Sequence, residues 1–152
     1  SVIASTTALM TTLNRLAAET LRAYSTTDVH ACTDVTGFGL IGHASEMAAA
    51  SNVTIHIVST AVPLIEGVRG LVDRNRTAGG SANQDHFGSR VNDGIDDDLL
   101  ALLYDPQTSG GLLVAVNQDR SPEVTQKLQS AGVSATKIGE VASQSDMLVS
   151  VS

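Results

Sequence analysis

Short β-branched segments alternate along the chain with longer segments of helical periodicity, and this alternation most constrains the fold. The clearest strand pattern is residues 53–58 (VTIHIV), where apolar and polar side chains alternate. Residues 29–34 and 112–116 are typical of further strands, and residues 136–141 and 147–151 of two closing strands. Strands that alternate with helices favour an α/β or α+β domain, with a mixed β-sheet and helices packed on its faces.

Four segments have the apolar spacing of amphipathic helices. They are residues 6 or 7 to about 24, 40–52, 63–72 with a proline at the first helical position, and 121–131, which a glycine ends. The short apolar run 99–103 fits either a strand or a helical turn.

Residues 77–94 show no apolar periodicity. The segment is polar and contains Gly79, Gly80, Gly88 and Gly94. A segment of this length without secondary structure in a compact domain is usually functional or disordered. We therefore expect a loop here, and we expect it to be the most mobile part of the domain.

Composition excludes several classes of protein. The 152 residues suit one domain, and 9 basic against 16 acidic residues give a net charge of −7, which argues against binding to a nucleic-acid backbone. A single cysteine excludes an internal disulfide framework and is compatible with the cytoplasm. No apolar run has a membrane-spanning length, and the start lacks the features of a secretory signal. Because it begins with serine, we expect the chain either to be part of something longer or to carry the remnant of a tag.

The first candidate site is the hexapeptide 34–39 (DVTGFG). It places the Asp34 carboxylate at the end of a strand, before a glycine-rich turn into a helix. Hard cations such as Mg²⁺ take oxygen ligands, and a helix N-terminus with free backbone N–H groups favours phosphate. The alternative is that Asp34 only caps a turn and that the glycines only permit positive φ.

The second candidate is residues 105–111 (DPQTSGG), directly before the strand 112–116. Thr108 and Ser109 offer hydroxyl groups, while Gly110 and Gly111 allow a ligand to approach the backbone or form an anion-binding nest. An ordinary loop with an Asp-Pro turn is the alternative.

The remaining titratable residues give weaker signals. His30, Cys32 and Asp34 share one face of a strand, which makes a soft-metal site conceivable. Their spacing matches no common zinc pattern, so a small buried cysteine beside a polar strand end is the preferred interpretation.

Three histidines and an acidic run suggest no catalytic arrangement. His43, His56 and His86 lack ligand or triad spacing, and His56 is expected to face solvent. Residues 96–98 (DDD) fit a solvated turn or the start of a helix. The sequence supplies no catalytic nucleophile.

Residues 33–43 (TDVTGFGLIGH) and 105–113 (DPQTSGGLL) together resemble selenophosphate synthetase, also called selenide, water dikinase. Residues 10–14 and 138–141 are similar to the lead-in helix and closing strand of that family, so the resemblance spans nearly the whole chain. Aminoimidazole ribotide synthetase, thiamine-phosphate kinase and the hydrogenase maturation protein belong to the same ATP-using superfamily, but they share only an Asp–Gly-rich turn.

The resemblance implies a single C-terminal domain, residues 1–152, of the aminoimidazole ribotide synthetase C-terminal type. The family enzyme uses ATP, selenide and water to make selenophosphate, AMP and phosphate, with Mg²⁺. Its N-terminal half carries the catalytic cysteine or selenocysteine and further metal-binding aspartates, so no catalytic residue is expected here. We further expect a homodimer in the full-length enzyme, with neither nucleic acid nor a membrane as partner.

Site residues follow from the same resemblance. The family's metal ligand in this half falls on Asp34. The implied nucleotide or phosphate contacts are Thr36, Gly37, Gly39, Thr108, Ser109, Gly110 and Gly111. One departure is the segment 79–84 (GGSANQ), which keeps the glycines of a family Gly-Gly-x-x-Arg-Asn pattern but lacks the arginine. Two alternatives stay open: a non-catalytic binding or regulatory module, or a superfamily member with another phosphate acceptor.

Overall fold

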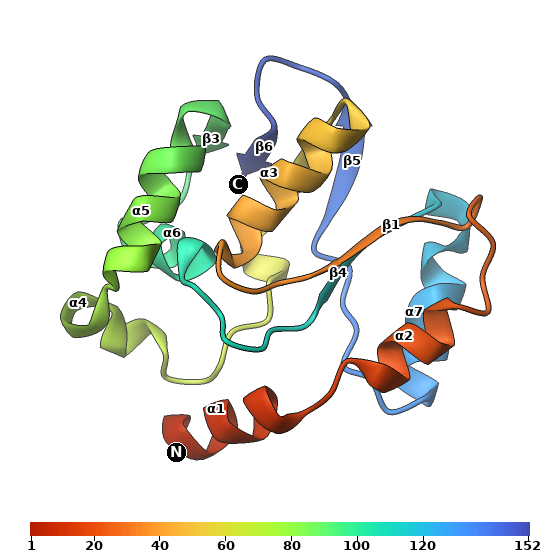
Figure 1. Cartoon of the computed structure of the whole chain (residues 1–152), viewed down its shortest axis with the longest axis horizontal. Coiled ribbons are helices and arrows are strands. Elements are labelled where there is room, and N and C mark those ends of the chain that lie inside the picture. Colours follow the sequence, from red (N-terminus) through yellow and green to blue (C-terminus); the bar gives the residue numbers. More distant parts are fainter.

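Six strands form two separate sheets in the computed structural model, which describes residues 1–152 (Figure 1). Strands β1 (Val29–Asp34) and β4 (Leu112–Val116) pair antiparallel. The second sheet has the order β3-β6-β2-β5, with β2 antiparallel to β5 and parallel to β6, which is parallel to β3. Its strands are β2 (Val53–Ile57), β3 (Val91–Asp93), β5 (Gly139–Ser143) and β6 (Val149–Val151). The expected mixed α/β architecture is confirmed.

Seven helices accompany these sheets. They are α1 (Val2–Thr11), α2 (Arg15–Leu21), α3 (Gly39–Ser51), α4 (Val72–Asn75), α5 (Ala78–Phe87), α6 (Asp97–Tyr104) and α7 (Ser121–Ser130). The helix expected over 40–52 is α3, and the one expected over 121–131 is α7. The undecided run 99–103 lies in α6, where Asp96 caps the helix by accepting a hydrogen bond from the Leu99 N–H at 3.0 Å. None of the helices is long and apolar enough to cross a membrane.

The main core lies between the four-stranded sheet and helices α3 and α6. Ile41, Ala44 and Ala48 of α3 are fully buried, and they pack with Ile57 and Val149 of the sheet. His56, between the buried Ile55 and Ile57, faces solvent as expected. The core is aliphatic because the chain has few aromatic residues, and burial of this apolar surface is the main stabilising term.

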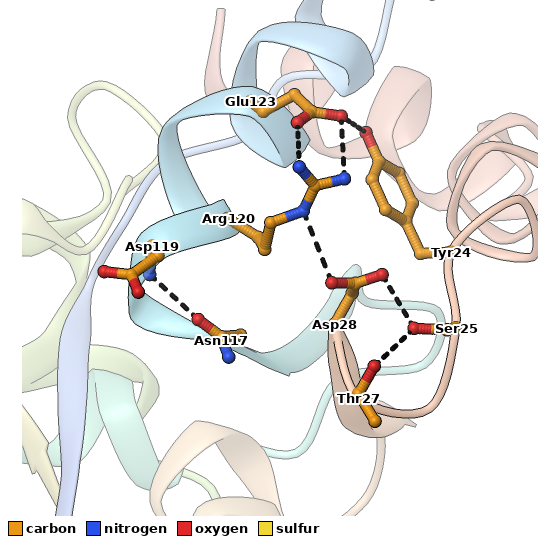
Figure 2. Close-up of polar contacts among 8 residues, drawn as sticks. All are labelled: Tyr24, Ser25, Thr27, Asp28, Asn117, Asp119, Arg120 and Glu123. Carbon is orange, nitrogen blue, oxygen red and sulfur yellow. Dashed lines mark hydrogen bonds and ion pairs between the residues drawn. The ribbon is translucent and has the colours of Figure 1, made fainter.

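A second, smaller core lies where α2 and α7 pack beside the β1–β4 pair (Figure 1). Leu21, Val124 and Leu128 are buried there. Polar contacts close the edge of this core (Figure 2): Arg120 pairs with Glu123 at 2.7 Å and with Asp28 at 3.3 Å. The network thus ties the loop before β1 to the start of α7.

Acid is expected to weaken this network. The Ser25 hydroxyl, which donates to Asp28 Oδ2 at 2.7 Å, holds the pKa of Asp28 below its ordinary value of 3.8, and Arg120 adds to the effect. A carboxyl with a lowered pKa stabilises the fold above its unfolded pKa and stops doing so as pH falls through its folded pKa. Between pH 6 and pH 2, the free energy of unfolding should therefore fall less in Asp28→Asn than in the wild type. Urea titrations should detect this, with Asp119→Asn as the control for a lost exposed charge.

Two of the predicted helices, in the first half of this chain, have the wrong extent. The single helix expected from residue 6 or 7 to about 24 is split into α1 and α2, because Asn14 turns inward and its amide donates to the Gly110 carbonyl at 3.0 Å. The helix expected over 63–72 is absent before residue 69, where a short 3-10 turn leads into α4. Gly67 has a φ of 83°, a left-handed backbone that ends any helix at that point.

The prediction of an unstructured loop over 77–94 is also wrong, because the segment contains α5 and β3. Thr77 caps α5 by accepting a hydrogen bond from the Gly80 N–H at 3.0 Å. A Cβ on Gly79 would lie 2.8 Å from the Pro106 side chain. This glycine therefore serves close packing rather than flexibility.

Cys32 is exposed, which corrects its interpretation as a buried cysteine. The alternation of β1 turns His30, Cys32 and Asp34 outward, away from the core side of the strand. Partial desolvation and, less, the Asp34 charge raise the pKa of the Cys32 thiol, so it is a poor nucleophile.

Candidate functional site

The turn after β1 is shaped by one glycine. Gly39 begins α3 with a φ of 69°, and a Cβ there would lie 2.7 Å from the Tyr104 carbonyl carbon and 2.9 Å from the Leu103 oxygen. Gly37 has ordinary φ, and a Cβ there would meet nothing within 4 Å. The two glycines of the motif thus have different roles: Gly39 permits close packing against α6, and Gly37 lies open to solvent.

The structure brings the two candidate motifs together. The Val35 N–H donates to the Gly111 carbonyl at 2.9 Å, and the Gly110 N–H donates back to the Val35 carbonyl at 3.1 Å. A third bond runs from the Gln107 N–H to the Thr36 carbonyl at 2.9 Å. Segments some 70 residues apart in the sequence therefore form one continuous loop surface beside the β1–β4 pair.

Gly110 is required at this junction. A Cβ on Gly110 would collide with the Val35 carbonyl oxygen and the Gln107 side chain, whereas one on Gly111 would meet nothing within 4 Å. Gly110 is buried and Gly111 is exposed. Gly110 therefore permits the close approach of the two loops, and Gly111 leaves its backbone open to a ligand.

Several backbone donors of the paired loops are free. The N–H groups of Thr36, Gly37, Thr108, Ser109 and Gly111 make no hydrogen bond within the chain, whereas those of Gly39 and Gly110 donate to Thr36 and Val35. Free backbone N–H groups in glycine-rich loops are the kind of donor that binds phosphate oxygens. Of the seven residues expected to contact nucleotide or phosphate, five thus keep a free donor, and the two buried glycines shape the loops.

Asp34 is the exposed carboxylate at the edge of this surface. Its side chain makes no ion pair and no hydrogen bond within the chain. The structure contains no group of three His, Cys, Asp or Glu residues that could hold a metal ion. His30, Cys32 and Asp34 share a face of β1 but do not form such a group.

His43 approaches the site from α3, although its spacing gave no reason to expect it. It is 9% exposed, and its Nε2 lies 3.2 Å from the Thr36 hydroxyl. Its Nδ1 lies 3.5 Å from Glu46, and the Phe38 ring packs against it with centroids 5.4 Å apart. These contacts hold the Thr36 side chain in one direction. The sequence signal that could have indicated His43 is its position as a polar residue on the buried face of an amphipathic helix, seven residues after Thr36.

Two further asparagines bind the motifs from other elements. Asn14 reaches the Gly110 carbonyl from the start of α2. Asn83 of α5 is buried, and its side-chain amide donates to the Gly37 carbonyl and to the Tyr104 carbonyl, both at 2.9 Å. Asn83 lies in the segment 79–84, which was noted only for its missing arginine, and no pattern marked Asn14. Each asparagine makes its contacts with segments distant in the sequence.

Two cavities lie near the candidate motifs, and the larger of them borders the second motif. It has a volume of about 400 Å³ and lies among α1, α4, α5 and α6, with Thr77 and Asp105 on its wall. Thr77 also donates to the Asp105 carboxylate at 3.1 Å. The smaller cavity, about 190 Å³, lies between β1 and α3 and includes Cys32, His43 and Glu46.

Comparisons with known proteins identify the family of the chain. The family model "AIR synthase related protein, C-terminal domain" matches residues 2–151. The chain is 39% identical over 145 residues to a selenide, water dikinase of Agathobacter rectalis, covering 93% of this chain and 41% of the relative. It is 41% identical over 146 residues to the selenide, water dikinase of Trichlorobacter lovleyi, covering 95% and 41%. The chain thus spans about two fifths of the length of these curated relatives.

A solved structure shows the same fold. The hydrogenase maturation protein HypE in complex with ATP superposes with a TM-score of 0.56 and 26% identity, covering 87% of this chain and 32% of that one. Fold, paired motifs and the match to nearly every residue agree. The chain belongs to the family of AIR synthase related protein C-terminal domains.

Proposed function

We propose that the chain is the C-terminal domain of a selenide, water dikinase, which makes selenophosphate from selenide, ATP and water and releases AMP and phosphate. The observation that carries the proposal is the pairing of the loops 34–39 and 105–111 through three backbone hydrogen bonds. Similarity of about 40% to relatives of that name, across both loops, supports this assignment.

Mg²⁺ is the cation that suits Asp34. The donor is a single exposed carboxylate, and Mg²⁺ commonly takes one or two carboxylates and completes its shell with phosphate oxygens and water. When bound, Mg²⁺ would neutralise charge on the phosphates of ATP. Asp34 would hold that cation as a single carboxylate ligand, and the N-terminal half would supply the further carboxylates.

Phosphate binding falls to the free backbone donors beside Asp34. Thr36 and Gly37 on one loop, with Thr108, Ser109 and Gly111 on the other, present N–H groups that have no partner within the chain. His43 fixes the Thr36 side chain through its contact with the Thr36 hydroxyl at 3.2 Å. Gly39 and Gly110 keep the two loops in contact. These residues bind and orient; none of them is a nucleophile.

The rest of the reaction is assigned to a longer protein. ATP and selenide would meet this domain together with an N-terminal half that supplies the reactive cysteine or selenocysteine. We place that protein in the cytoplasm as a homodimer. An ATP-dependent enzyme with another phosphate acceptor is the second candidate, since HypE in complex with ATP shares the fold. The lower identity of 26% to HypE favours the dikinase.

Selenide dependence tests the proposal. The longer protein should release AMP from ATP in the presence of Mg²⁺ and selenide, with selenophosphate visible by ³¹P NMR. The 152-residue chain alone should release none, because it carries one candidate ligand for Mg²⁺ and its single cysteine has a raised pKa. ATP consumption by the longer protein that ignores selenide would favour the other acceptor. Selenide-dependent AMP release by the chain alone would contradict the assignment of the chemistry to the other half.

A further inference from the structure

Helix α5 contacts both motifs at once. At its start, Thr77 donates to Asp105 at 3.1 Å, and Gly79 packs so closely on Pro106 that a Cβ would lie 2.8 Å from that ring. Two turns later, Asn83 reaches the Gly37 and Tyr104 carbonyls. The helix therefore spans the junction between the loop 34–39 and the loop 105–111.

Asn83 makes the most demanding of these contacts. Its side-chain NH₂ group has two hydrogens, and the structure uses one for the Gly37 carbonyl and the other for the Tyr104 carbonyl. The residue is 8% exposed, so water cannot easily replace either bond. One carbonyl belongs to the loop 34–39 and the other to the last residue of α6, directly before the loop 105–111, and a single planar amide links them.

We propose that Asn83 is a positioning residue, which sets the separation of the Asp34 turn from the Asp105 loop and thereby the geometry of the phosphate-binding surface. The proposal rests on the proposed function for its catalytic consequence. The positioning itself is a property of the chain alone. Asn83 does not face a substrate: it acts through the backbone of Gly37 and Tyr104.

The first test is hydrogen exchange on the 152-residue chain. In Asn83→Ala, the amides of Gln107 and Gly110, which bond to the other loop, should exchange about tenfold faster relative to the Ile55 amide of β2. Val124→Ala is the control, since Val124 is 2% exposed in the second core and touches neither motif. It should lower the melting temperature without changing that ratio.

A purely structural role predicts a different result. If Asn83 only stabilises the fold, both Asn83→Ala and Val124→Ala will speed exchange of the Gln107 and Gly110 amides by the same factor as exchange of the Ile55 amide. The proposal is then wrong. Should Asn83→Ala fail to fold, Asn83→Ser keeps one donor on a shorter side chain. Asn83→Ser should show the same selective loss of exchange protection at the Gln107 and Gly110 amides. If that selective loss is not seen, the proposal is equally overturned.

The second test uses the longer protein. Misplacing the loops should raise the KM for ATP by about tenfold in Asn83→Ala, while Val124→Ala, assayed well below its melting temperature, leaves the KM unchanged. Equal KM values in both variants would contradict the positioning role. If the wild-type protein consumes no ATP, the proposed function fails, and the exchange experiment still decides whether Asn83 positions the loops.

Discussion

Replacing Asp34 by asparagine is expected to lower Mg²⁺-dependent ATP consumption of the longer protein by about a hundredfold or more. The amide has the same shape but lacks the charge that holds a hard cation. Stability should change by no more than about 0.5 kcal/mol, because the side chain is exposed and makes no bond within the chain. Activity assays at saturating Mg²⁺, paired with urea titrations, measure both effects.

A control separates this effect from a general loss of negative charge. Asp146 is an exposed carboxylate in the β5–β6 connection and makes no ion pair. Asp146→Asn should leave both turnover and stability unchanged. Near-normal turnover of Asp34→Asn at saturating Mg²⁺ would remove Asp34 from the site and assign the metal wholly to the other half of the protein.

Elements with strong local patterns were predictable from the sequence. The alternation over 53–58 gave β2, whose buried Ile55 and Ile57 flank the exposed His56. The helix of 121–131 was equally clear, because a proline near the start and a glycine at the end delimit an amphipathic stretch. In these segments the local signal and the tertiary environment agree, which is why the prediction held.

Elements that depend on distant contacts were not predictable. The polar helix α5 lacks apolar periodicity, and it forms because Thr77 caps it and its glycines pack on Pro106. The apolar residues of 63–72 satisfy a helical spacing, yet the left-handed Gly67 prevents the helix. Tertiary packing overrides local propensity in both segments.

The residues of the candidate site also fall into those that the sequence indicated and those that only the structure shows. The two motifs were recognisable because the residues of each are adjacent in the sequence. Their joining into one surface is seen only in the structure, where three backbone hydrogen bonds link them. Asn83 and His43 contribute single polar side chains from separate helices. Such contacts depend on the three-dimensional arrangement of α3 and α5. For His43 the only local signal was a polar residue on the buried face of α3, and spacing assigned no role to either residue.

The second large effect is expected from Gly39. Gly39→Ala should destabilise the domain by about 2–4 kcal/mol, because the new Cβ must enter a left-handed backbone conformation and meet the backbone of α6 at less than 3 Å. Backbone atoms cannot move aside as a flexible side chain can, so the start of α3 must shift instead. Urea unfolding of the 152-residue chain, followed by circular dichroism, measures the loss.

Gly37→Ala is the matched control two residues away. A Cβ there meets nothing within 4 Å, and the residue has no positive φ, so the free energy of unfolding should change by less than about 1 kcal/mol. Similar losses for the two variants would show that the Tyr104 contact does not decide the conformation of the turn. A large loss confined to Gly39 would establish that close packing on α6 requires this glycine, leaving Gly37 free to meet a ligand.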